Sequence, residues 1–125
     1  MIDINSTHIV PKNWGHENVI CNNSKYCGKI LVIEKNKFCS LHFHKLKEED
    51  FFVLEGTIQL TIQKIENDVR IGEIETTILK QGDVVNLKPY TLHRFCGIDD
   101  INKLIEFSTQ HFEDDSYRLE PSCEK

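Results

Sequence analysis

The segment 57–65 alternates polar and apolar side chains with a period of two residues. Ile58, Leu60 and Ile62 fall on one side of the alternation, and threonine and glutamine residues fall on the other. This pattern predicts a β-strand with one buried and one solvated face, because successive side chains of a strand point to opposite faces of its sheet. Such a strand must bury its apolar face against a second layer of structure.

Short apolar runs of the same kind occupy much of the remaining chain, and turn residues such as Gly56 and Gly82 separate them. No run with helical periodicity is longer than about two turns. The predicted strands are 29–34, 38–44, 51–55, 57–65, 69–71, 75–79, 84–87, 93–96 and 103–108. Many short strands at this spacing predict an all-β fold, an antiparallel sandwich or barrel.

The 125 residues suit one domain, and no repeat or low-complexity linker divides them. We expect a single domain over 1–125. Its parts are an N-terminal arm with an early strand near 17–21 (1–27), a barrel core (28–109) and a polar tail that forms a short helix or stays loose (110–125). A lone barrel of this size leaves a sheet edge and an apolar outer face, so we expect a homodimer formed by sheet extension or by an exchanged N-terminal arm.

Charge and cysteine usage restrict the partners. Fifteen Lys and Arg against 20 Asp and Glu give a net charge of -5 with the basic residues scattered, which disfavours nucleic acid as a partner. The apolar runs are too short to span a bilayer, and the N-terminus lacks the pattern of a secretion signal. The five cysteines form no CxxC pair and suit reduced thiols. We therefore expect a soluble, cytoplasmic protein that binds neither nucleic acid nor membranes.

Two histidines lie two residues apart on a predicted strand. His42 and His44 share one face of that strand, because residues i and i+2 project to the same side. Glu49 begins the next predicted strand, from which its carboxylate can turn back toward the pair, and His93 on a later strand is the candidate fourth ligand. Imidazoles and one carboxylate, with open positions left over, are what a catalytic divalent metal needs; Zn, Fe, Mn, Co and Ni suit this set alike.

The spacing of these residues resembles the cupin family, whose first motif reads G-x5-H-x-H-x3-4-E-x6-G. In this chain its positions are Asn36, His42, His44, Glu49 and Gly56, and Gly82 and His93 mark the second motif. Asn36 replaces the first glycine, and Asn is the next best residue at positive φ. The resemblance implies a jelly-roll barrel, the double-stranded β-helix, with a metal inside its mouth.

Further segments are similar to the cupin domain of type II mannose-6-phosphate isomerases and related sugar isomerases. These segments are Asn13-Trp14-Gly15, Tyr26 to Lys29, Cys39 to His44, His93-Arg94, Ile105-Glu106, and Glu113 to Asp115 with Arg118. The similarity covers most of the chain and implies a metal-dependent isomerase that interconverts the aldose and ketose forms of a sugar or sugar phosphate.

Two other functions remain open at this stage. One is a non-catalytic, metal-dependent module that binds or senses carbohydrate. The other is a small metal-dependent dioxygenase or lyase, of which the dioxygenase needs a redox-active iron. A polar cavity of roughly a few hundred cubic ångström would favour the isomerase. An interior blocked by Phe38, Phe52, Phe95 or Phe107 would favour the binding module.

Candidate catalytic and substrate-binding residues follow from the isomerase hypothesis. The place of Lys29 in the resemblance implies a substrate contact or an acid/base role, and Glu106 is a carboxylate inside an apolar run, so either residue could move the proton between C1 and C2. Arg94 and Arg118 could bind an anionic sugar phosphate through bidentate contacts, or form surface ion pairs. The charge run 45–50 is expected to be a solvated loop in which only Glu49 points inward.

Overall fold

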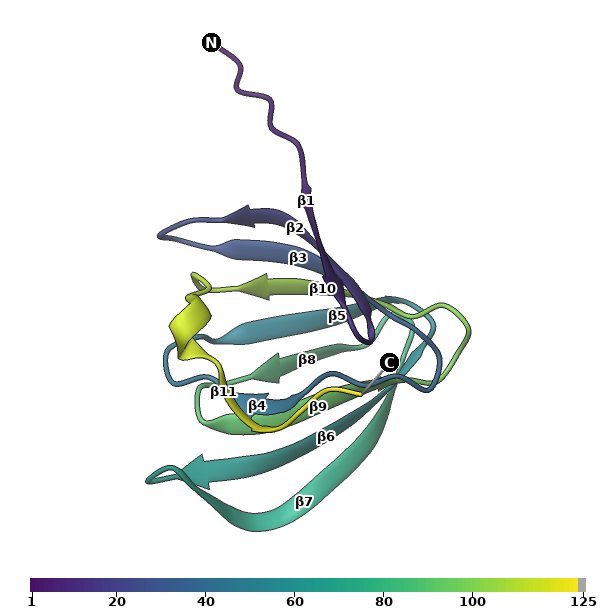
Figure 1. Cartoon of the computed structure of the whole chain (residues 1–125), viewed down its shortest axis with the longest axis vertical. Coiled ribbons are helices and arrows are strands. Elements are labelled where there is room, and N and C mark those ends of the chain that lie inside the picture. The colour runs from purple at the N-terminus through teal and green to yellow at the C-terminus, as the bar shows by residue number, and fades with distance from the viewer. Residues whose placement is uncertain (124–125) are drawn as a thin grey trace.

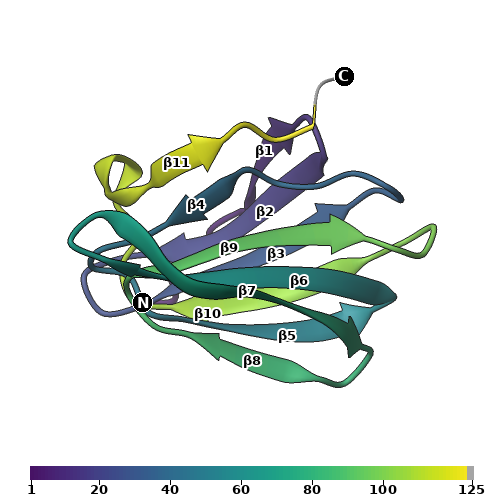
Figure 2. The same ribbon diagram turned by 90° about the horizontal axis from the view of Figure 1, so that it is seen from below.

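The computed structural model describes residues 1–123 and contains two antiparallel β-sheets that face each other (Figure 1, Figure 2). Its elements are β1 (His8–Lys12), β2 (Gly15–Asn22), β3 (Cys27–Ile33), β4 (Leu41–Phe43), β5 (Glu49–Glu55), β6 (Thr57–Glu66), β7 (Val69–Lys80), β8 (Val84–Leu87), β9 (Thr91–Gly97), β10 (Lys103–Ser108), the 3₁₀ turn η1 (Glu113–Asp115) and β11 (Tyr117–Glu120). One sheet has the strand order β1-β2-β3-β10-β5-β8, and the other has the order β11-β4-β9-β6-β7. The prediction of an all-β jelly-roll barrel is confirmed.

β7 differs from the prediction, which placed two separate strands in its range. The strand is continuous from Val69 to Lys80, although Gly72 lies within it at a φ of 73°. The pairing register of β6 with β7 shifts between Ile62 and Lys64, and Gln63 donates a side-chain hydrogen bond of 2.8 Å to the carbonyl of Gly72. The glycine therefore marks a β-bulge, which bends a strand without ending it.

Both ends of the chain contain more strand than predicted. β1 and β2 form an antiparallel hairpin where an arm and one short strand were expected, and residues 1–7 extend away from the barrel (Figure 1). In the predicted polar tail, the expected short helix is η1, and β11 follows it and pairs with β4. The last two residues of that tail, 124–125, lie outside the described residues. No helix within 1–123 has the length and hydrophobicity needed to cross a bilayer.

Inward-facing positions change from apolar to polar along several strands. On β3, Leu31 and Ile33 are buried in the apolar core, whereas Lys29 is buried nearer the start of the strand. On β10, Leu104 and Glu106 show the same change. The buried core cluster is Trp14, Leu31, Ile33, Cys39, Phe51, Val53, Ile58, Leu60, Leu79, Leu87, Phe95, Leu104 and Cys123. Apolar side chains thus fill one end of the barrel, and charged side chains lie between the sheets at the other.

Asn102 ties together the turns at the apolar end. This residue is fully buried, and its amide accepts hydrogen bonds from the N–H groups of Thr57 (3.0 Å) and Asp99 (3.1 Å). It also donates to the carbonyls of Ile33 (2.9 Å) and Asp99 (2.8 Å). A Cβ atom on Gly56, whose φ is 84°, would lie 2.5 Å from the Asn102 Oδ1, so the adjoining turn requires glycine.

We expect Asn102→Ala to lower the free energy of unfolding by about 2–4 kcal/mol, because it leaves one buried and three partly buried backbone groups without this partner. Urea denaturation of the variant and of Asn86→Ala would measure this. Asn86 also donates several hydrogen bonds, but it is exposed, so water replaces them and the loss should stay below about 1 kcal/mol. An equal loss of unfolding free energy in the two variants would contradict the stabilising role of the Asn102 hydrogen bonds.

Candidate metal centre

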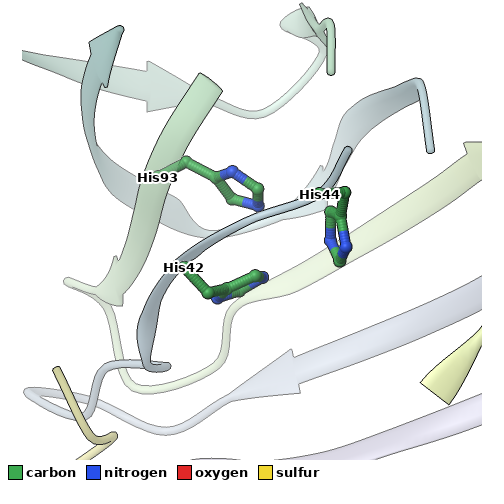
Figure 3. A group of neighbouring side chains, drawn as sticks. All are labelled: His42, His44 and His93. Carbon is green, nitrogen blue, oxygen red and sulfur yellow. The ribbon is translucent and has the colours of Figure 1, made fainter. Parts of the chain in front are cut away.

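Three histidines from two neighbouring strands converge at the polar end of the barrel. β4 carries His42 and leads directly into His44, and β9 carries His93, which is the ladder partner of His42. One ring nitrogen of each residue lies within 4.8 Å of the others, and the rings approach a common space (Figure 3). The structure therefore brings together the three predicted histidine ligands.

A backbone carbonyl fixes each imidazole through its Nδ1 atom. His42 contacts the carbonyl of Ser40 at 2.9 Å, His44 that of Asp115 at 2.8 Å, and His93 that of Thr91 at 2.9 Å. Because a carbonyl oxygen only accepts, each Nδ1 carries the proton and each Nε2 presents a lone pair. This is the tautomer in which Nε2 can bind a metal ion.

Burial keeps these rings neutral. Desolvation lowers the pKa of His93 to about 4 and lowers the pKa values of His42 and His44. At neutral pH the three histidines therefore present three uncharged donors, as metal binding requires.

Glu49 supplies a carboxylate beside these nitrogens. It is the first residue of β5, and its oxygens lie 3.8 Å from the Nε2 of His44 and 3.5 Å from the Nε2 of His93. Burial, and then the charge of Glu106, raise the pKa of Glu49 to about 8. Three neutral nitrogens and one carboxylate fit a divalent ion of the Zn, Fe, Mn, Co and Ni group.

We expect binding of a divalent ion to release a proton from Glu49. Since its raised pKa keeps the group protonated below about pH 8, the apparent affinity should rise with pH up to about 8 and then level off. Histidine protonation should add little above pH 5–6, because the pKa of His93 is about 4. Calorimetric titration with Mn²⁺ in buffers of different ionisation enthalpy would count the proton. Glu49→Gln should bind more weakly and lose the release near neutral pH; unchanged release in this variant would assign the proton elsewhere.

Lys47 is an inward-facing residue that the sequence analysis missed. The prediction that only Glu49 of the run 45–50 points inward is wrong, since the Lys47 side chain is 3% exposed. Its ammonium lies 3.3 Å from Glu49, forms an ion pair with Glu106, and is 3.1 Å from the Nδ1 of His111. Burial lowers the pKa of Lys47, but Glu106 and Glu49 outweigh this and hold it above its usual value. No sequence period predicts this orientation, because Lys47 lies in a loop.

Lys29 and Glu106 lie opposite each other on paired strands. Both are buried, and the Nζ of Lys29 is 3.4 Å from a carboxylate oxygen of Glu17 on β2. Burial raises the pKa of Glu106, but Lys47 and Lys29 outweigh burial and lower it, so the group is a carboxylate at neutral pH. Acidic and basic side chains thus form a buried network beside the histidines.

A cavity of about 440 Å³ contains the histidines and this network. Phe51 and Phe95 contribute to its apolar lining, whereas Phe38, Phe52 and Phe107 do not line it. The exposed side chains of His8 on β1 and Arg118 on β11 also line it, and Lys12 is a further lining residue. The interior is therefore open and largely polar, the arrangement that the sequence analysis associated with a substrate site.

The two candidate arginines lie in different places. Arg118 is exposed, lines the cavity and pairs in register with His42. Arg94 is not a lining residue: its guanidinium donates to the carbonyls of Cys39 and Pro121, both at 2.9 Å, and lies 4.5 Å from the centre of the Phe38 ring. The alternation of β9 explains this, since Arg94 follows His93 and points to the opposite face. The structure does not bring Arg94 to the cavity.

Facing antiparallel sheets with a histidine cluster at one end define the class of this protein as a cupin. Within that class, the chain belongs to the family described as mannose-6-phosphate isomerase C-terminal, whose model matches residues 3–120. No curated protein sequence matches the chain.

Solved structures share the fold at low identity. The capsular polysaccharide assembling protein CapF from Staphylococcus aureus has a TM-score of 0.79 at 18% identity, over 94% of this chain and 32% of CapF. The oxalate decarboxylase of Lactobacillus farciminis has a TM-score of 0.75 at 17% identity, over 90% of this chain and 34% of that one. KdgF from Halomonas sp. has a TM-score of 0.66 at 12% identity, over 79% of this chain and 81% of KdgF. The chain thus spans about a third of the first two proteins.

Proposed function

We propose that the chain is a metal-dependent isomerase that interconverts the aldose and ketose forms of a sugar or sugar phosphate. The observation that carries this proposal is the buried network of Lys29, Lys47 and Glu106, which lines the same cavity as the histidines. Burying charged groups costs free energy. A site that only binds a neutral sugar does not require buried charges. Membership of the mannose-6-phosphate isomerase C-terminal family also supports the proposal.

In the proposed mechanism, different residues of the cavity bind the metal ion, move the proton and contact the substrate. A divalent ion held by His42, His44, His93 and Glu49 would polarise the carbonyl and the adjacent hydroxyl of the sugar. Glu106, which Lys47 and Lys29 keep ionised, takes the proton from C2 of the aldose and delivers it to C1, while the hydroxyl proton of O2 passes to O1 to give the ketose. Lys29 donates a hydrogen bond to a substrate oxygen and is the alternative acid/base residue.

The mouth of the cavity suits an anionic group at the far end of the substrate. Arg118 is exposed there, and Lys12 lies on the same lining. A phosphate bound by these cations would leave the carbonyl end free to reach the histidines. Arg94 has no part in this proposal, because its donors bind backbone carbonyls on the other face of β9.

We also infer that the chain acts as a cytoplasmic homodimer. Ile2 and Ile4 are 84% and 89% exposed in the extended segment before β1, which is an edge strand. Unpaired strand edges and exposed apolar side chains are features that association covers. All five cysteines are free, as suits a reducing compartment.

The test is deuterium exchange on a panel of aldoses and aldose phosphates incubated with the protein and Mn²⁺, Co²⁺ or Zn²⁺ in D₂O. An isomerase should produce ketose, with deuterium entering at C2 of the aldose or C1 of the ketose to the extent that the transferred proton exchanges with solvent. Binding without ketose or deuterium incorporation would favour the carbohydrate-binding module. Oxygen consumption by the Fe²⁺-loaded protein would favour the dioxygenase.

A further inference from the structure

Asp115, in the C-terminal 3₁₀ turn η1, reaches the loop that joins β4 to β5. Figure 1 shows η1 beside that loop, although some 70 residues separate the two segments. The Oδ1 of Asp115 accepts hydrogen bonds from the N–H groups of Lys45 (2.9 Å) and Leu46 (3.2 Å). Its Oδ2 accepts from Leu46 (3.2 Å) and Lys47 (3.2 Å). One buried carboxylate therefore collects three successive backbone amides.

The same residue also holds a histidine of the metal centre. The backbone carbonyl of Asp115 accepts the 2.8 Å hydrogen bond from the Nδ1 of His44. His44 immediately precedes the three amides, Lys47 supplies the last of them, and Glu49 follows two residues later. Asp115 thus contacts His44 through its backbone carbonyl and Lys47 through its carboxylate, and the ammonium of Lys47 in turn lies 3.3 Å from Glu49.

Backbone hydrogen bonds hold the two ends of the loop, from the N–H of Tyr90 to the carbonyl of His44 (2.7 Å) and from the N–H of Thr109 to the carbonyl of Glu48 (3.1 Å), but the amides between them depend on Asp115. Between Phe43, where β4 ends, and Glu49, where β5 begins, the amides of 45–47 make no backbone hydrogen bond in the described part of the chain. Successive N–H groups that converge on an anion form a nest, and hydrogen bonds to a charged acceptor are stronger than neutral ones. Without the carboxylate, these amides would lose their acceptor, and the position of Lys47 would depend only on the contacts of its ammonium with Glu49, Glu106 and His111.

We propose that Asp115 is a positioning residue that presets His44, Lys47 and Glu49 for the cation and the substrate. It acts through the loop and the His44 ring and does not touch the reacting atoms. The part of this inference that concerns the cation rests on the proposed function, in which the histidines and Glu49 bind a metal ion. The ordering of the loop by Asp115 does not depend on the proposed function.

Two substitutions and a matched control test the proposal. Asp115→Ala removes both carboxylate oxygens but keeps the backbone carbonyl that accepts from His44. Asp115→Asn keeps one side-chain oxygen and turns the other end of the carboxylate into a donor that faces a backbone N–H. Asp114→Ala removes the same charge from an exposed neighbour in η1. The readouts are amide hydrogen exchange of the cation-free protein, resolved by NMR, and titration with Co²⁺ followed by its visible absorption spectrum.

We expect Asp115→Ala to speed exchange at 45–47 by at least about 10-fold while the amides of β6 and β9 stay protected. Its Co²⁺ affinity should fall about 10- to 100-fold, with a changed absorption spectrum. Asp115→Asn should speed exchange at one end of the loop and lose less affinity, and Asp114→Ala should match the original protein. If Asp115→Ala does not fold, Asp115→Asn alone tests the proposal: faster exchange at one end of the loop supports it, and unchanged exchange contradicts it.

Several results would overturn the proposal. Exchange and Co²⁺ spectra that match those of Asp114→Ala would show that Asp115 positions nothing. Equal acceleration throughout β6, β9 and the loop would assign Asp115 to general stability. Absence of Co²⁺ binding by the unmodified protein would instead overturn the metal site, and the exchange data would still decide whether Asp115 orders the loop.

Discussion

Replacing His93 by alanine is expected to abolish tight binding of a divalent ion and to lower its affinity by more than about 100-fold. The ring of His93 lies between His42, at 4.5 Å between centroids, and Glu49, at 3.5 Å between Nε2 and a carboxylate oxygen. Its loss removes one of four donors and the nitrogen nearest the carboxylate. Turnover should disappear in parallel, because the proposed chemistry needs the polarised carbonyl.

Elemental analysis and Co²⁺ titration would check the His93→Ala prediction. His16→Ala is the matched control, since His16 lies on β2 but does not line the cavity. This control should retain the metal content and the turnover of the original protein. Retention of one tightly bound ion by His93→Ala would mean that the cation site lies elsewhere, and the proposal for the donor set would be wrong.

Local periodicity accounts for the parts that the sequence predicted well. The segment 57–65 forms most of β6. The two-residue spacing of His42 and His44 places both rings on one side of the chain, His42 within β4 and His44 directly after it. Spacing of this kind survives folding because a strand has a fixed period of two. The same rule explains the placing of Arg94: as the direct neighbour of the inward His93, it had to face away from the cavity.

Long-range contacts account for what the sequence could not predict. Lys47 is held in its inward position by partners distant in the chain: its amide donates to Asp115, 68 positions later, and its ammonium forms an ion pair with Glu106 on β10. A run of charged residues in a loop predicts a solvated surface when the sequence does not show which distant residue will pair with it. The strand β11 likewise depends on its pairing with β4, since the polar sequence of 117–120 has little strand signal of its own.

Glu106→Gln is expected to lower kcat by about 10²- to 10⁴-fold while one divalent ion stays bound, because the variant loses the proposed base and keeps all four donors. The substitution preserves the size of a side chain that is 3% exposed. Its amide oxygen can still accept from the ammonium of Lys47, the partner of Glu106 in an ion pair. Ketose formation in D₂O, together with metal content, separates loss of the base from loss of the site.

Two further variants accompany Glu106→Gln: Lys29→Met tests the alternative residue, and Glu48→Gln is the control. Lys29 faces Glu106 across the β3–β10 ladder, so Lys29→Met tests the alternative acid/base residue. Glu48→Gln removes a carboxylate that pairs with Lys88 at the surface and should leave turnover unchanged. If Glu106→Gln retains full turnover while Lys29→Met loses it, the proton passes through Lys29, and Glu106 serves to balance the charges of Lys29 and Lys47. If only Glu106→Gln loses turnover, the carboxylate is the base, and the two lysines keep it ionised.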